Sequence, residues 1–306
     1  MAIPPKDPPK EGNTIPPARN AGSPPHPEKD VDTIPPRGGT RQDLYLRLMT
    51  EQLTGWDNPR VMLERALKEN LFLLLAQKIL PLTKGMPDPV CYEVLLRLKQ
   101  EEDSMLPPGG FLDLAESLGM MPEIDHWVLG AVLSWSAARA TARPSAPLPM
   151  MCVNISGRAL MSDSFLGAAR EEFDAAGVPP GAMCFEISER DVIEQPRRTR
   201  AFMDALKPLG CRFTVDGFGS ARISFSHLEG LPFDFLKIDG VIIDGVHGRL
   251  GLATVKAISI VCQEVGIRTI AEFVESKATL DKLREIGVDY IQGFGVARPE
   301  PITKIA

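Results

Sequence analysis

The sequence is poor in residues that cross-link a protein or give it a basic surface. Its 306 residues include five cysteines, an odd number without any CxxC pair. This pattern argues against a disulfide framework or a zinc site and predicts buried, reduced thiols. Basic residues are outnumbered by acidic ones, 34 to 40, and the net charge of −6 argues against a binder of nucleic-acid polymers. The cysteines are Cys91, Cys152, Cys184, Cys211 and Cys262.

Long hydrophobic runs are also missing. The N-terminal residues MAIPPKDPPKEG lack the apolar core of a signal peptide. The longest strongly apolar run, LFLLLA at 71–76, is far shorter than the roughly 20 residues that cross a bilayer. We therefore expect a cytoplasmic protein without a membrane span.

The first 70 residues differ in composition from the rest. Residues 1–39 hold eleven of the 28 prolines and the tetrapeptide TIPP twice, which predicts a disordered tail or, alternatively, a proline-rich docking ligand. Residues 40–70 have helical spacing and predict a short arm of two helices, the second starting near Asn58-Pro59. This arm either serves dimerisation or signalling, or packs on the wall of the main domain.

The main domain, residues 71–306, alternates short apolar runs with helical stretches. The runs include MCVNIS, CFEIS, FDFLKID and YIQGFGV, and stretches such as FLGAAREEFDAAG between them end in glycine, as helices do. Eight strands that alternate with helices predict a (β/α)₈ barrel of the TIM type. An open doubly wound sheet ranks lower, because no GxGxxG follows an early strand.

Polar or charged residues stand at or near the C-terminal end of nearly every predicted strand. In a (β/α)₈ barrel these ends meet on one face, where such enzymes place their sites. Because buried carboxylates and other polar groups without partners are costly, eight polar residues in register indicate a shared function. Acids, an amide and a lysine suit a hard divalent cation and a phosphate. The residues are Gln77, Glu93, Asn154, Glu186, Asp216, Lys237, Glu272 and Gln292.

Six motifs occur in order around these positions. They are Glu93-Val94-Leu95-Leu96-Arg97, Asn154-Ile155-Ser156, Glu186-Ile187-Ser188-Glu189, LKID at 236–239, AEFVE at 271–275 and DYIQG at 289–293. Together they make residues 71–306 resemble the EAL-domain family, phosphodiesterases that open the second messenger cyclic di-GMP to linear pGpG. The first motif corresponds to the Glu-Ala-Leu that names the family.

The resemblance implies a role for each position. A first Mg²⁺ or Mn²⁺ would be held by Glu93, Asn154, Glu186 and Asp216, and Asp216 would bridge to a second ion beside Glu272. The attacking water would be oriented and acidified by Lys237 with the help of Gln292, while Arg97 and Gln77 would contact phosphate and guanine. The loop after the fifth strand would be braced by Glu189, and the site would be supported by Glu275. Two such ions generate hydroxide and stabilise an in-line displacement.

The chain departs from the family at one motif. The family's Asp-Asp-Phe-Gly-Thr/Ser-Gly reads Asp216-Gly217-Phe218-Gly219-Ser220-Ala221, so Gly217 replaces a ligand of the second ion, and the next loop reads Ala221-Arg222-Ile223-Ser224. Loss of even a supporting group of a metal site costs about 10–100-fold in affinity or activity. The ligands of the first ion are all present. This combination predicts binding without efficient turnover, unless Ser220, a water molecule or Glu272 compensates.

The sequence therefore favours a cyclic di-GMP receptor that signals to a protein partner, with lost or much reduced hydrolysis. A slow phosphodiesterase that produces pGpG is the alternative, and an interaction scaffold without ligand is the second alternative. A homodimer is also expected from the resemblance. The histidines, among them His227 near the altered loop, are predicted to be solvated or structural.

Overall fold

The computed structural model describes residues 56, 58–82, 90–99, 105–106, 109, 111–220 and 224–305, and all statements below concern these residues. The chain divides into two units, 1–44 and 45–306, and every element below belongs to the second unit. The predicted tail 1–39 and the first predicted helix of the arm lie outside the described residues. Within the described part, no helix combines the length and the apolarity that a bilayer crossing requires.

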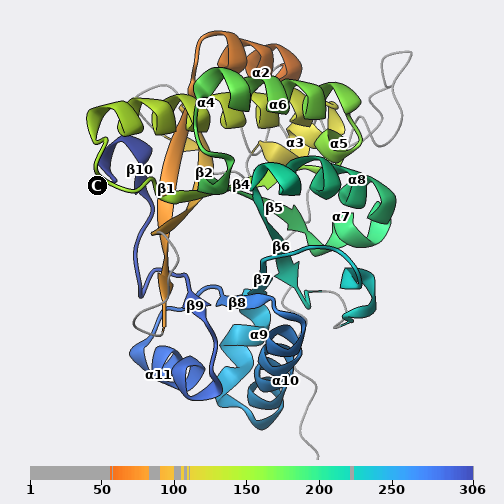
Figure 1. The fold of residues 1–306 in the computed structure, drawn as a ribbon, viewed down its shortest axis with the longest axis vertical. Coiled ribbons are helices and arrows are strands. Elements are labelled where there is room, and N and C mark those ends of the chain that lie inside the picture. Colours follow the sequence, from red (N-terminus) through yellow and green to blue (C-terminus); the bar gives the residue numbers. More distant parts are fainter. Residues whose placement is uncertain are drawn as a thin grey trace, which may run out of the picture. The chain divides into compact units, whose positions relative to one another are not determined.

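Eight strands form a closed barrel (Figure 1). Their order is β1-β9-β8-β7-β6-β5-β4-β2, and the pairing of β1 with both β9 and β2 closes the sheet. Two short strands extend it, because β3 pairs with β2 and β10 pairs with β1. The strands are β1 (Phe72–Pro81), β2 (Cys91–Lys99), β3 (Met105–Leu106), β4 (Met150–Ile155), β5 (Met183–Ser188), β6 (Arg212–Phe218), β7 (Phe235–Ile238), β8 (Arg268–Ala271), β9 (Tyr290–Ile291) and β10 (Glu300–Pro301).

The first strand runs against the other seven. Strand β1 is antiparallel to both β2 and β9, whereas β2, β4, β5, β6, β7, β8 and β9 pair in parallel. The barrel is therefore mixed. The sequence had predicted that strands and helices alternate from the first strand onward, and this prediction is wrong for β1 and β2, between which no described residue is helical. The reason is the connection, since only residues 82–90 separate β1 from β2 and a parallel pair needs a crossover of about a dozen residues or more.

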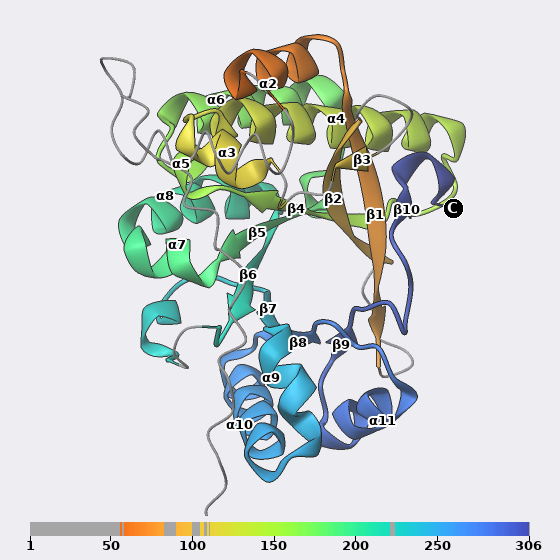
Figure 2. The same ribbon diagram turned by 180° about the vertical axis from the view of Figure 1, so that it is seen from behind.

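Helices surround the barrel (Figure 2). As predicted, α2 begins at Pro59, where the Asn58 side chain accepts a hydrogen bond from the Val61 amide. The predicted glycine ends are confirmed for three helices, whose final caps have φ between 62° and 92°. The helices are α2 (Pro59–Lys68), α3 (Leu112–Ser117), α4 (Met121–Ala142), α5 (Gly157–Leu160), α6 (Asp163–Ala176), α7 (Glu189–Glu194), α8 (Pro196–Leu206), α9 (Gly240–Asp244), α10 (Arg249–Val265) and α11 (Lys277–Ile286).

Aromatic rings join two of these helices to the barrel wall. Phe185 of β5 is completely buried and its ring lies 6.3 Å from that of Phe173 in α6 and 5.4 Å from that of Phe202 in α8. The ring of Phe213 in β6 is 5.9 Å away. Tilted and edge-on rings at such distances attract one another in addition to the apolar area that they bury. Phe185 is therefore central to the packing of α6 and α8 on β5.

We predict that Phe185→Ala lowers the free energy of unfolding by about 3–5 kcal/mol, because it leaves a cavity among three rings that cannot collapse fully. Urea unfolding followed by circular dichroism measures this value. The matched control is Phe294→Ala, since Phe294 is 58% exposed and its removal should cost less than about 1 kcal/mol. Equal losses for the two variants would contradict the packing role of Phe185.

Candidate ligand- and metal-binding site

The barrel interior consists of an apolar layer and a polar layer. The apolar layer is formed by Ile79, Cys91, Met150, Cys152, Cys184, Phe235, Ile270 and Tyr290. Because side chains alternate between the two faces of a strand, the residue two positions further along points inward as well. On this rule seven of the eight predicted polar residues enter the interior two positions from a member of the apolar layer. The eighth, Asp216, stands two positions after the buried Thr214 of β6. All five cysteines are free and buried, as predicted, and three of them belong to the apolar layer.

Two polar residues reach this layer differently from the prediction. Glu93 is the third residue of β2, not near its C-terminal end, and Gln77 comes from the reversed strand β1. The register places Gln77 opposite Glu93 and Glu93 beside Cys152 of β4. Both strands continue past the layer, because they remain paired with one another as far as Phe72. The prediction that these two residues stand near the C-terminal ends of their strands was therefore wrong, although both residues lie in the polar layer.

The ammonium group of Lys237 lies at the centre of the polar layer. It is 3.0 Å from carboxylate oxygens of Glu93, Glu186 and Glu272 and 3.2 Å from Asp216 Oδ1. Lys237 is only 1% exposed, so these contacts occur almost entirely away from solvent. Four side chains from β2, β5, β6 and the end of β8 thus converge on one cation from β7. The sequence prediction that these residues meet agrees with this arrangement.

Burial and charge act in opposite directions on the pKa values of this cluster. Burial alone would lower the pKa of Lys237, but the surrounding carboxylates raise it well above its usual value, and the lysine is charged. Burial raises the pKa of Glu186 well above normal and that of Glu272 to about 7, against the attraction of Lys237. The pKa of Glu93 is lowered despite its burial, because Lys237 and three hydrogen bonds stabilise the ionised form.

Side-chain amides complete the layer. Gln292 Nε2 donates hydrogen bonds to Glu93 Oε2 at 2.6 Å and to Gln77 Oε1 at 3.1 Å. Asn154 Nδ2 donates to Glu93 Oε1 at 3.1 Å, and Gln77 Nε2 donates to the carbonyl of Ala297 at 3.0 Å. Through these bonds all eight predicted residues belong to one connected network. Glu93 joins the two parts of this network, the charged cluster around Lys237 and the side-chain amides.

The donor atoms of the layer fit a hard divalent cation. Carboxylate and amide oxygens are the ligands that Mg²⁺ and Mn²⁺ prefer, and four acids exceed the single charge of Lys237. Glu186 Oε1 is buried and accepts no hydrogen bond from any described residue, so one ligand oxygen has no other function. Among the described His, Cys, Asp and Glu side chains, however, no three are already arranged around one metal position. Their oxygens face the Lys237 ammonium.

The glycine beside Asp216 has an unusual backbone conformation. Gly217 has φ 66°, in the left-handed region, and the register between β6 and β7 shifts between Val215 and Phe218. A Cβ at position 217 would meet no atom within 4 Å, so there is room for a larger side chain. Aspartate and asparagine tolerate this region better than most other residues. At this position the chain thus provides no oxygen ligand, although an aspartate would fit.

Glu189 connects α7 to the loop that follows β6. Its carboxylate accepts a hydrogen bond from the Gly219 amide at 3.0 Å, and its other oxygen lies 3.3 Å from His227 Nε2. Burial raises the pKa of Glu189, although both contacts oppose that shift. The Gly219 contact is the type of bracing that the resemblance implied. Ala221–Ile223, where the loop differs from the family, lies outside the described residues.

A cavity of about 310 Å³ opens beside the polar layer. Arg97 lines it, half-buried, and burial lowers the pKa of its guanidinium against the attraction of Glu93. Gln77, Glu93, Glu272 and Gln292 contribute to the wall, together with Glu275 and the exposed ring of Phe294. A cation, amides and aromatic surface in one cavity suit a nucleotide phosphate with an attached base. Glu275 is exposed here and lies at the rim.

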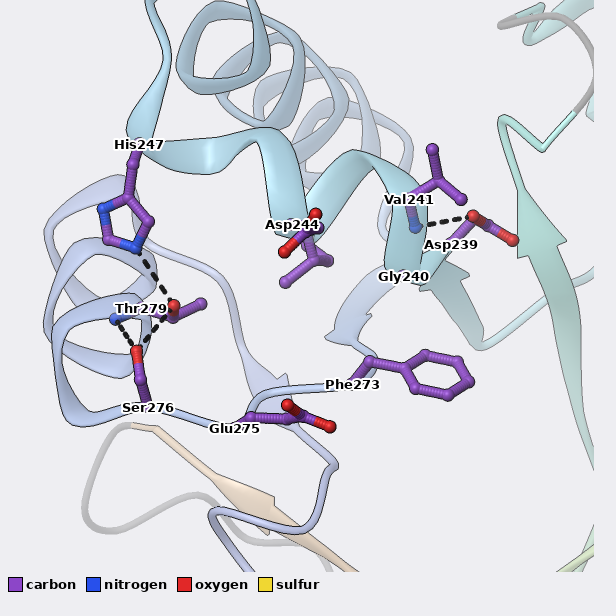
Figure 3. A pocket seen from close by; sticks show the side chains of 10 residues that line it. Asp239, Gly240, Val241, Asp244, His247, Phe273, Glu275, Ser276 and Thr279 are labelled. Carbon is purple, nitrogen blue, oxygen red and sulfur yellow. Dashed lines mark hydrogen bonds between the residues drawn. The ribbon is translucent and has the colours of Figure 1, made fainter.

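A second cavity of about 730 Å³ shares part of this rim (Figure 3). Phe273 and Glu275 line both cavities. Phe273 is 70% exposed and has φ 53°, a strained conformation for a bulky residue, and its ring lies against Gly240. Strain of this kind is often found at functional sites. Sequence analysis gave Phe273 no role, because nothing in the motif AEFVE indicates a positive φ.

Fold and site together define a class: closed barrels of eight strands with a polar layer, rich in acids, in their interior. The chain matches the model of the EAL domain family over residues 60–299. This match covers most of the chain, which therefore belongs to the EAL domain family.

Known proteins resemble the chain over the same region. It is 32% identical over 243 residues to the cyclic di-GMP phosphodiesterase PdeB of Shewanella oneidensis, covering 79% of this chain and 28% of that protein. For the cyclic di-GMP phosphodiesterase PdeF of Escherichia coli the identity is 29% over 241 residues, 78% of this chain and 31% of that protein. The chain thus spans less than a third of the length of either relative.

Solved structures agree with this assignment. The EAL domain of FimX from Pseudomonas aeruginosa, bound to c-di-GMP, has a TM-score of 0.74 and 28% identity, over 79% of this chain and 96% of that chain. The FimX EAL domain from Xanthomonas citri, in complex with c-diGMP, has the same TM-score, 27% identity, and covers 85% and 99% of the two chains.

We predict that Lys237→Met lowers the free energy of unfolding by about 3–5 kcal/mol at pH 8 in the presence of EDTA. The variant keeps an unbranched side chain of similar volume but leaves four buried or partly buried carboxylates without their shared cation. Urea unfolding provides the measurement.

Lys282→Met is the matched control for this variant. Lys282 pairs with Glu285 on the exposed side of α11, so its loss should cost less than about 1 kcal/mol. If Lys237→Met were as stable as the wild type, the ammonium would not hold the layer together.

Proposed function

We propose that this chain binds cyclic di-GMP and acts mainly as a receptor, with lost or much reduced hydrolysis. Membership of the EAL family and the named ligand of the FimX structures support the nucleotide. The polar layer, with the cavity beside Arg97, supports a phosphate-containing ligand at this position. Occupancy would be passed to a protein partner, and a homodimer in the cytoplasm is the expected setting.

The proposed loss of turnover rests on one observation, which is that Gly217 supplies no side-chain oxygen next to Asp216. Binding depends on the first ion and on direct contacts, and all the residues proposed for these are present. Turnover would depend on a second divalent ion as well, which would help to activate water, and a side-chain oxygen at position 217 would be needed to hold it. A defect restricted to that second site therefore separates binding from catalysis.

The proposed roles follow the family position by position. Glu93, Asn154, Glu186 and Asp216 would hold Mg²⁺ or Mn²⁺, and Gln77 and Arg97 would contact the nucleotide. A bound divalent ion would supply Lewis-acid polarisation of a phosphate oxygen and of water. Lys237, Glu272 and Gln292 would orient the water and stabilise developing charge. Glu189 would hold the loop after β6, and Glu275 would support the rim of the site.

A slow phosphodiesterase that yields pGpG is the second candidate. It is favoured by the similarity to two cyclic di-GMP phosphodiesterases, PdeB and PdeF, and by the presence of Lys237 and Glu272. A scaffold that binds neither nucleotide nor metal is a third and weaker candidate, because Gln77, Arg97 and Lys237 are retained.

We further propose residues 1–39 as a tail, 40–70 as an arm and 71–306 as the EAL domain.

Binding and turnover can be measured separately on the full chain. Calorimetry with cyclic di-GMP in Ca²⁺ should give a saturable binding signal, and overnight incubation with Mg²⁺ or Mn²⁺ should give little or no pGpG by chromatography. Several turnovers per minute would instead establish the phosphodiesterase. Failure to bind the nucleotide would leave the scaffold as the remaining candidate.

Restoring the missing carboxylate provides the second test. We predict that Gly217→Asp raises the rate of pGpG formation by at least about tenfold, because a carboxylate then lies beside Asp216. The space around position 217 is open, and aspartate tolerates its backbone conformation. The rate is measured by chromatography at saturating nucleotide with Mn²⁺.

Gly217→Asn is the matched control, since it has nearly the same size and backbone demand but no charge. It should raise the rate much less than Gly217→Asp. An unchanged rate in Gly217→Asp would mean that the missing carboxylate is not the main defect, and that the altered loop at 221–224 is responsible.

A further inference from the structure

One buried acid outside the polar layer has no role in the proposed chemistry. Asp125 lies on α4, is 5% exposed, and was not singled out from the sequence. Its Oδ2 accepts two hydrogen bonds from Ser156, one from the backbone amide at 3.0 Å and one from the hydroxyl at 2.5 Å. A single oxygen thus binds both donors of one residue.

Ser156 is the residue at which β4 becomes α5. It follows the last residue of β4, and its Oγ caps α5 by accepting a hydrogen bond from the Ala159 amide at 3.2 Å. Asn154, a proposed ligand of the cation, stands two residues earlier and donates to Glu93. The two hydrogen bonds from Ser156 to Asp125 therefore fix the position and direction of the strand end that carries Asn154.

The neighbouring strand has the same arrangement with one difference. Ser188 stands two residues after Glu186 and caps α7, and its hydroxyl donates to Asp191 at 2.7 Å. Asp191 belongs to the helix that Ser188 caps, so this contact is local. Asp125, in contrast, comes from a different helix, 31 residues away in the sequence. The end of β4 is thus attached to α4, whereas the end of β5 depends on its own helix.

We propose that Asp125 is a positioning residue, which sets the orientation of Asn154 toward the cation by holding Ser156. The inference rests on the proposed function, because it takes Asn154 as a ligand. Burial raises the pKa of Asp125 to about 7 although the Ser156 bonds oppose this, so the carboxyl is held in an unfavourable environment.

Mn²⁺ alone, titrated into the full chain and followed by electron paramagnetic resonance, tests the proposal without requiring any catalysis. Asp125→Ala should weaken Mn²⁺ binding about tenfold, as expected when the group that orients a ligand is removed. Asp125→Asn should remain within about threefold of the wild type, because its amide oxygen can accept the same two hydrogen bonds. This rescue distinguishes orientation from charge.

Val128→Ala is the matched control, because Val128 is buried one turn further along α4 and its apolar side chain cannot accept a hydrogen bond from Ser156. It should lower thermal stability as Asp125→Ala does but leave Mn²⁺ affinity unchanged. In a second background, Asn154→Ala, the substitution Asp125→Ala should have no further effect on affinity, since its action passes through Asn154.

Each other outcome overturns the proposal. Wild-type affinity in Asp125→Ala, or an equal loss in Val128→Ala, would reduce Asp125 to a structural residue while leaving the proposed function intact. An additive loss in the Asn154→Ala background would mean that Asp125 acts by another route. A wild-type chain without affinity for Mn²⁺ would remove the metal assignment itself, and the positioning role with it.

Discussion

The contact between the Lys237 ammonium and four carboxylates is the interaction on which the rest of the site depends. The cation is buried in a closed barrel, where removing charges from water is costly unless they are paired. The four acids outnumber this single cation. In the proposed function, this surplus of acidic groups and the free oxygen of Glu186 would give the layer its affinity for a divalent cation.

The geometry of the layer follows from the alternation of side chains along the strands. The parallel strands place a polar residue two positions after an inward-facing one, which is apolar in all of them except β6, where it is Thr214. Strand β1 obeys the same rule in the opposite direction, with Gln77 two positions before Ile79. The reversed strand thus contributes an amide, which reaches Gln292 across the barrel closure.

The altered position at the end of β6 leaves the fold unaffected. Gly217 occupies a left-handed conformation that glycine adopts without strain, so the turn forms although a carboxylate is missing. Asp216 still reaches Lys237, and Glu189 still holds the Gly219 amide. Gly217 therefore changes the charge and the oxygen groups of the site without disturbing its framework, and the proposed function separates ligand binding from turnover for this reason.

The barrel, the start of α2 at Pro59 and the set of eight polar residues could be predicted from the sequence, because periodicity and end signals are local properties of the chain. It did not determine the direction of β1, which depends on a pairing that closes the barrel. Nor did it indicate the strained Phe273 or the contact of Asp125 with Ser156. Those features arise where segments that are distant in the sequence meet, and these contacts form only when the whole chain folds.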